Sequence, residues 1–137
     1  MKTLLVSFVF ATLMSSSSAF GAERTYQCSF TKECIGTDGC GDTTFQLTIE
    51  KLDGGVSIPE SALVSTAPSH QIVTDAETLS AYAFASKDGK VAGVWAPREN
   101  GDFQSLTIAE DGVARYSIHM PTSELAIFYR GTCKAPS

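Results

Sequence analysis

Apolar and polar residues alternate along most of the second half of the chain, from Thr78 to Cys133. Three turn dipeptides divide this stretch at nearly even spacing: Asp88-Gly89, Asn100-Gly101 and Asp111-Gly112. Asn-Gly and Asp-Gly pairs accept the positive φ angles of two-residue hairpin turns, and the segments between them are rich in β-branched and aromatic residues. The pattern therefore predicts an antiparallel meander.

The first half of the chain contains another clear strand. Phe45, Leu47 and Ile49 share one face of residues 43–50, and polar side chains occupy the positions between them. Residues 31–42 are rich in Gly and Asp and are predicted to form a loop. Together with the meander, the predicted strands cover residues 24–30, 43–50, 78–86, 91–96, 103–109, 113–120 and 125–133.

Residues 56–77 have a mixed pattern that leaves two interpretations open. Pro59 and Pro68 are incompatible with central positions in a sheet. Residues 61–66 and 71–74 have the composition of short strands, whereas residues 60–64 equally suit one helical turn after Pro59. We leave these alternatives open.

These elements predict an all-β domain of seven to nine strands with no helix in the folded part. Hairpin connections at even spacing indicate either an up-and-down barrel, closed or nearly closed, or a strongly coiled sandwich. Closure also removes the exposed sheet edges that an exported β protein must otherwise protect.

The N-terminus has the pattern of a secretory signal peptide. Lys2 precedes an apolar run over residues 4–14 and a small, polar stretch over residues 15–22. The apolar run is too short to anchor the chain in a bilayer. We expect residues 1–21 to be the signal peptide, with cleavage near residues 19–22, and residues 22–137 to form one secreted or periplasmic domain.

Four cysteines in an exported chain predict two disulfide bonds. Of the three possible pairings, we favour Cys34–Cys40, which closes a small loop, and Cys28–Cys133, which joins the first strand to the last. The second bond also favours the barrel. The spacing of Cys28, Cys34 and Cys40 is not a usual zinc spacing, so we predict no metal site.

Charge narrows the range of partners. Removal of the signal peptide leaves nine Lys and Arg against 15 Asp and Glu, a formal charge of about −6. This balance disfavours nucleic acid and anionic membranes and suits a basic protein partner, although moderate acidity also serves solubility.

No catalytic set emerges from the residue types. No Gly-x-Ser-x-Gly motif is present, and the two predicted disulfides leave no free thiol. His70 and His119 are predicted to lie on the surface. Glu33, Asp38 and Asp42 are best explained as solvated acids of a loop rather than as calcium ligands. We therefore predict a protein that is not an enzyme and needs no cofactor.

Two loops are the predicted contact points for a protein partner, because recognition residues concentrate on loops carried by a rigid sheet. The first holds Glu33, Asp38 and Asp42, and the second holds Arg98 and Glu99. The leading hypothesis is a non-enzymatic binding protein, such as an inhibitor, that acts on another protein through these loops.

The alternative is a lipocalin-like carrier of a small apolar ligand. The chain has eight Phe, four Tyr and one Trp, and a wide barrel would place some of these rings around a cavity. Tyr82, Phe84 and Trp95 are the candidate lining residues. Packing of these rings in an ordinary core is the simpler explanation.

The chain resembles the small exported bacterial β-barrels that inhibit c-type lysozymes. The resemblance lies in Tyr26-Gln27-Cys28, the single Trp95, the Asp-Gly meander and the terminal Cys133. It implies a barrel that binds a lysozyme. The inhibitory Ser/Gly-rich loop of that family is not found here, and Cys34 and Cys40 are additional, so no inhibitory residues are transferred.

Overall fold

The computed structural model describes residues 23–53, 58–59, 67–86 and 90–135, and the predicted signal peptide lies outside them. These residues form β-strands and one 3-10 turn, η1 (Pro121–Ser123), so the predicted all-β class is confirmed. The strands are β1 (Glu23–Ile35), β2 (Cys40–Asp42), β3 (Gln46–Lys51), β4 (Ile58–Pro59), β5 (His70–Val73), β6 (Thr78–Ala85), β7 (Val91–Pro97), β8 (Phe103–Ile108), β9 (Val113–Met120) and β10 (Leu125–Lys134).

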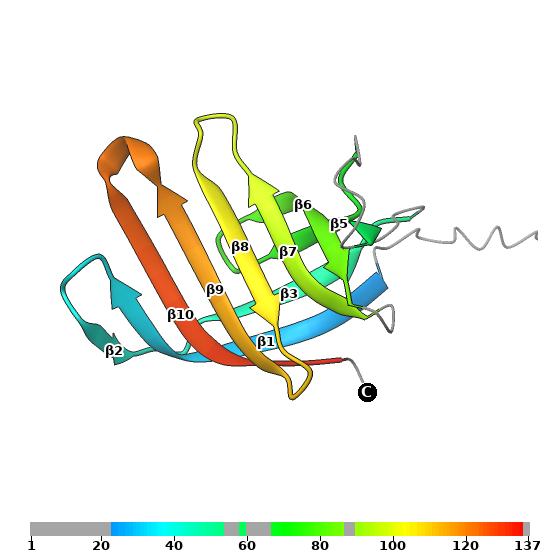
Figure 1. The fold of residues 1–137 in the computed structure, drawn as a ribbon, viewed down its shortest axis with the longest axis horizontal. Helices are drawn as coiled ribbons and strands as arrows, with labels where there is room; N and C mark the ends of the chain where they lie inside the picture. Colours follow the sequence, from blue (N-terminus) through cyan, green and yellow to red (C-terminus); the bar gives the residue numbers. More distant parts are fainter. Residues whose placement is uncertain (1–22, 54–57, 60–66, 87–89, 136–137) are drawn as a thin grey trace, which may run out of the picture.

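Eight of these strands close into an antiparallel barrel (Figure 1). The order around the barrel is β1, β3, β5, β6, β7, β8, β9 and β10, and β10 pairs again with β1. Strands that are neighbours in the barrel are also consecutive in the chain once the short β2 and β4 are left out. These two short strands pair with β1 and β6. The predicted up-and-down barrel is therefore confirmed.

The loop predicted over residues 31–42 is wrong for most of its length. β1 continues to Ile35 and pairs with β10, and β2 returns along β1. Cys34 and Cys40 are directly opposite each other and are joined by a disulfide, which fixes this hairpin. Gly36 and Gly39 turn the chain with φ angles of 52° and 92°, a region that favours glycine. The glycines therefore mark the turn of a hairpin rather than a whole loop.

The open question over residues 56–77 is answered in part. Residues 70–73 form β5, which bridges β3 and β6 and is required to complete the barrel. Pro59 lies in the two-residue β4, outside the main path of the sheet. The predicted strand over residues 61–66 and the alternative helical turn over residues 60–64 both lie outside the described residues.

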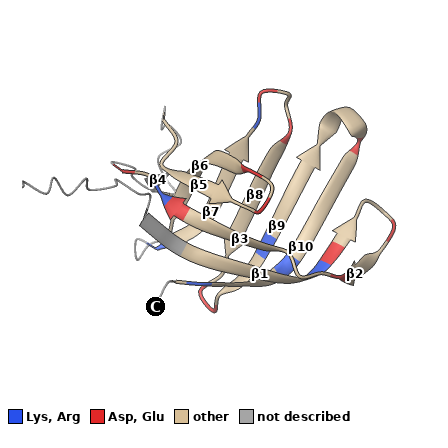
Figure 2. Ribbon diagram, turned by 180° about the vertical axis from the view of Figure 1, so that it is seen from behind, with Lys and Arg blue, Asp and Glu red and all other residues tan. Residues whose placement is uncertain are grey.

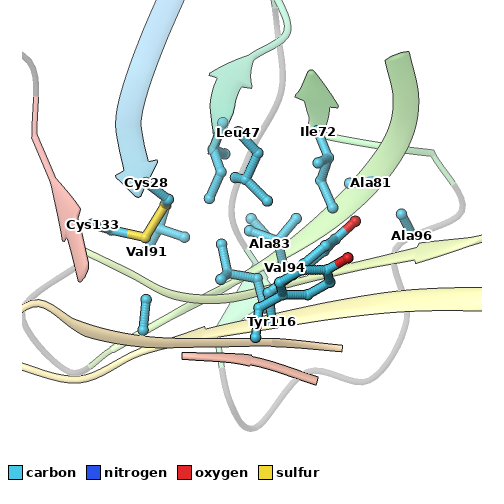
Figure 3. Packing of buried hydrophobic residues seen from close by; sticks show 14 of the residues in the cluster. Cys28, Leu47, Ile72, Ala81, Ala83, Val91, Val94, Ala96, Tyr116 and Cys133 are labelled. Atoms are coloured by element: carbon cyan, nitrogen blue, oxygen red, sulfur yellow. A yellow bond between two sulfur atoms is a disulfide. The ribbon is translucent and has the colours of Figure 1, made fainter. Parts of the chain in front are cut away.

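Side chains fill the interior of the barrel (Figure 3). Small and large residues complement one another there, as expected in a barrel of eight strands. Ala81, Ala83, Ala96 and Ala114 are fully buried and leave space for larger side chains on the opposite walls. The largest apolar side chains among those fully buried are Tyr116, Phe30, Ile49, Ile72, Leu106 and Val94.

The barrel closes where β1 meets β10. Cys28 lies opposite Cys133 in the register, and their disulfide is formed, as is Cys34–Cys40, so both predicted pairings are confirmed. Gly131 faces Phe30 on β1, next to a bulge at residues 30–32. A Cβ atom at Gly131 would overlap the carbonyl oxygen of Ser29. Closure therefore depends on a residue without a side chain at this position.

The two disulfides are expected to differ in their contribution to stability. Cys28 and Cys133 are 105 residues apart, whereas Cys34 and Cys40 are separated by six. On the chain-entropy model, replacing the first pair by Ala lowers the free energy of unfolding by about 4–5 kcal/mol and replacing the second pair by about 2 kcal/mol. Urea unfolding of both double variants measures this, and equal losses would contradict it.

Gly131→Ala is expected to destabilise the barrel by at least about 2–3 kcal/mol, because the methyl group forces the backbones of β1 and β10 apart. Gly41→Ala is the matched control, since nothing lies within 4 Å of a Cβ atom at that position. Thermal unfolding of the two variants compares them. A similar melting temperature for both would show that β1 and β10 are free to separate.

Candidate functional site

Four connections meet at one end of the barrel, which we call the acidic rim. They are the β1–β2–β3 segment over residues 32–45, the β5–β6 connection (74–77), the β7–β8 connection (98–102) and the β9–β10 connection (121–124). The alternating strand directions bring them to the same end, which lies at the top and left of Figure 1. Both loops predicted to bind a partner belong to this rim.

Charge is concentrated on the acidic rim (Figure 2). Its four segments contain eight acidic residues and two basic ones, a formal charge of −6. The opposite end is balanced, since the exposed acids described there are matched in number by lysines. The acids of the rim are Glu33, Asp38, Asp42, Asp75, Glu77, Glu99, Asp102 and Glu124, and its bases are Lys32 and Arg98. The exposed charges described at the opposite end are Asp53, Glu110, Asp111, Lys51, Lys90 and Lys134.

The cystine hairpin of β1 and β2 presents two of the predicted acids to solvent. Asp38 is exposed at the turn. Asp42 accepts a hydrogen bond from Lys32 Nζ at 2.5 Å, and this bond, together with the lysine charge, lowers the pKa of Asp42 below its usual value. The Cys34–Cys40 disulfide holds both strands of the hairpin, so these carboxylates project from a stiff element.

The third predicted acid of the hairpin, Glu33, has a different environment. It is half-buried and hydrogen-bonds with Tyr129, whose pKa rises to about 12 through burial first and through this partner second. Phe45 packs against Tyr129 with ring centroids 4.7 Å apart. Glu33 therefore belongs to the mouth of the barrel rather than to a solvated loop.

Arg98 and Glu99, the predicted contacts of the β7–β8 connection, also have different roles. Arg98 is half-buried and forms an ion pair with Glu77 of the neighbouring connection. Glu99 is exposed at the turn. The backbone of this turn is fixed by hydrogen bonds between Arg98 N and Asp102 O and between Gly101 N and Arg98 O. Of the two residues, Glu99 is available to a partner and Arg98 ties two loops together.

A polar chain behind the rim was not predicted from the sequence. Tyr116 donates a hydrogen bond to the side chain of Gln104, and Gln104 Nε2 donates to Glu77 Oε1 at 3.0 Å. Burial, and then the charge of Glu77, raise the pKa of Tyr116, so its hydroxyl stays protonated and acts as a donor. Gln104 occupies an inward position in line with Leu106 and Ile108. In the sequence, a polar residue at an inward position indicates that its side chain has a buried hydrogen-bond partner.

A hollow of about 620 Å³ opens at the rim between β3 and the β5–β6 connection. Its wall includes the hydroxyl groups of Thr43, Thr44 and Thr74 and the carboxylates of Glu33 and Asp75. The hollow exists because β3 pairs with β5 only from Thr48 to Lys51, so the two strands separate towards the rim. It gives the acidic rim a recess.

The candidate cavity residues lie on the outer side of the barrel wall. Ala81 and Ala83 are buried, so Tyr82 and Phe84, which alternate with them, face outwards. Tyr82 pairs with Trp95 on β7, their rings are 5.9 Å apart, and the Trp95 side chain is 40% exposed. These three rings do not line the interior of the barrel.

Comparisons with protein-family models, with curated proteins and with solved structures found no match. Among the residues whose positions are described, no helix is long and apolar enough to cross a membrane. The same part of the chain contains no group of three or more His, Cys, Asp and Glu side chains arranged to hold a metal ion. The function must therefore be argued from the geometry of this chain.

His70 was predicted to lie on the surface, and this is wrong, because its side chain is only 1% exposed. Its position in β5 directs it inwards, in line with the buried Ile72. Ser69 Oγ lies 2.9 Å from His70 Nδ1 and accepts a hydrogen bond from Ala83 N, an arrangement that suits a neutral ring. Burial, and then the charge of Lys51, lower the pKa of His70.

The buried His70 makes stability dependent on pH. Because its folded pKa lies below 6.5, the unfolded chain binds more protons below that pH, and the free energy of unfolding falls as the pH drops from about 6.5 towards the folded pKa. One such group contributes a slope of up to about 1.4 kcal/mol per pH unit. Urea unfolding between about pH 5 and 7.5 measures the slope. His70→Gln should reduce it, and an unchanged slope in that variant would contradict this assignment.

Proposed function

We propose that this chain is an exported, non-enzymatic binding protein that attaches to a basic protein through its acidic rim. The observation that carries the proposal is the concentration of a formal charge of −6 on four loops at one end, while the exposed charges described at the other end cancel in number. Charge complementarity of this kind speeds encounter with a partner of opposite sign and selects against acidic ones.

The rigidity of the rim supports recognition of a folded partner. The hairpin is closed by Cys34–Cys40, and the β5–β6 and β7–β8 connections are joined through the Arg98–Glu77 ion pair. Loops that are already ordered lose little conformational entropy on binding, so more of the interaction energy appears as affinity. The exposed acids Asp38 and Glu99 sit on two of these stiff loops.

A c-type lysozyme is the partner we propose to test first. Lysozymes of this class are basic, and the chain resembles the barrels that inhibit them. The rim also has a recess of about 620 Å³ beside Glu33 and Asp75, which suits the insertion of basic side chains. Inhibition would follow if the rim covers the substrate cleft of the enzyme.

Export to the periplasm or the extracellular medium is part of the proposal. The pattern of residues 1–21 supports a cleaved signal peptide. The two disulfides are typical of oxidising compartments, and they leave no free cysteine among the described residues.

The rim is tested by matched charge reversal. Asp38→Lys with Glu99→Lys changes two exposed acids of the rim, and Asp53→Lys with Glu110→Lys changes two exposed acids of the opposite end by the same total charge. At low salt, the first double variant should associate with a c-type lysozyme about tenfold more slowly than the unchanged protein. The second should change the rate by less than about twofold. Surface plasmon resonance measures both rates, and a cell-wall lysis assay measures inhibition.

Each unfavourable outcome of this experiment removes a different part of the proposal. If the unchanged protein neither binds nor inhibits the lysozyme, the lysozyme is not its partner. If both double variants lose the same amount, only the net charge of the protein matters and the rim is not the binding surface. If neither variant differs from the unchanged protein, binding occurs elsewhere.

A further inference from the structure

A second surface, on the outer wall of β8, β9 and β10, has the opposite chemistry to the rim. A hollow of about 390 Å³ lies there, and it is lined by Ser105, Thr107, Arg115, Ser117, Phe128 and Arg130 among others. We call these six residues, together with Trp95 on the adjacent β7, the outer patch. Its volume lies in the range of small-ligand sites.

Two arginines of the outer patch face each other across neighbouring strands. Arg115 on β9 is directly opposite Arg130 on β10, and Arg130 is opposite Lys32 on β1 (Figure 2). Lys32 has a counter-charge in Asp42, whereas no carboxylate of the described residues forms an ion pair with either arginine. Like charges directly opposite each other destabilise a sheet. An acidic protein that keeps such a pair has a ready site for an anion.

Aromatic rings lie at the two ends of the row of outward positions next to the arginine pair. Phe128 is 44% exposed and Trp95 is 40% exposed, in a row of outward positions that also contains Ser105 and Ser117. β7 and β10 are separated by three strand-to-strand spacings, so these two rings lie about 14 Å apart along the row. His119 packs edge-on against Phe128 at 5.8 Å and supports it. Exposed rings held in fixed positions are platforms for the apolar face of a flat or ring-shaped ligand.

Between the platforms the surface offers hydroxyl groups, and the guanidinium groups lie in the adjacent row. Ser105 Oγ and Ser117 Oγ lie 2.7 Å apart at the centre of the row. The backbone groups of β7 to β10 are paired in the sheet, so only side chains are available to a ligand here. This favours a ligand rich in hydroxyl groups over a peptide, which would need partners for its own backbone.

We propose that the outer patch binds an acidic oligosaccharide, a short chain of sugar rings that carries carboxylates as uronic acids do. The guanidinium groups of Arg115 and Arg130 hold a ring-borne carboxylate by charge-assisted hydrogen bonds. The apolar face of one ring packs on Phe128, and the chain extends over Ser117 and Ser105 towards Trp95. This site is separate from the acidic rim, and binding there does not depend on the protein partner.

Trp95 is the single tryptophan of the chain, so its fluorescence reports directly on the patch. The full mature protein is titrated with tetragalacturonate and, as controls, with neutral maltotetraose and a tetraglutamate peptide; calorimetry provides an independent affinity. Tetragalacturonate should shift the emission and bind at least about tenfold more tightly than either control.

Variants locate the site. Arg115→Gln with Arg130→Gln should weaken binding of tetragalacturonate at least about tenfold, and Lys51→Gln with Lys134→Gln, two exposed cations of the opposite end, should change it less than about twofold. Phe128→Ala should weaken binding, whereas Val113→Ala, at a side chain that is 46% exposed, should not. The arginine variant should melt no lower than the unchanged protein, because it removes a repulsion.

Four results would overturn the proposal. Absence of both a fluorescence change and a heat of binding with tetragalacturonate would show that the patch is not a site for acidic sugars. Equal binding of maltotetraose would show that the arginines are not used. Equal binding of the tetraglutamate peptide, or equal loss in both double variants, would show attraction between charges without recognition of a sugar.

Discussion

The contact between β1 and β10 is the constraint on which the rest of the structure depends. It requires three features at once: the Cys28–Cys133 disulfide, a glycine at position 131, and a long β1 that pairs with β10 up to Ile35. Once this contact forms, the sheet has no free edge along the barrel, and every second connection is directed to the same end. The acidic rim exists because closure gathers four loops that are far apart in the chain.

Closure with eight strands also decides where function is located. The interior of so small a barrel is filled by its own side chains, which include Phe30, Tyr116 and the alanines of β6, β7 and β9. A filled interior leaves the loop end and the outer wall as the surfaces for recognition. The buried polar chain from Tyr116 through Gln104 to Glu77 links that core to the rim loops. The packing of the barrel therefore helps to hold these loops in one conformation.

The sequence predicts those features that follow from local patterns. Period-two alternation and the Asp-Gly turns locate the strands of the meander within about two residues, and residues 113–120 agree at both ends. The predictions fail where the answer depends on register or on contacts distant in the chain. The hairpin at residues 31–42 extends β1 because β10 and the Cys34–Cys40 disulfide support it, and His70 is buried because β5 has neighbours on both sides. Tyr82 and Trp95 stand outside the wall because the small residues of their strands fill the narrow interior.

The same dependence on register explains why the net charge of the chain does not predict the charge of the outer patch. A chain with a formal charge of −5 is expected to repel anions on average. Closure nevertheless separates the charges: the acids gather at loops, whereas Arg115 and Arg130 face each other on β9 and β10. Residues 115 and 130 become neighbours only through the β9–β10 pairing, so no local pattern reveals them. One small barrel thereby offers two surfaces of opposite sign, and the two binding sites that we propose there would attract partners of opposite charge.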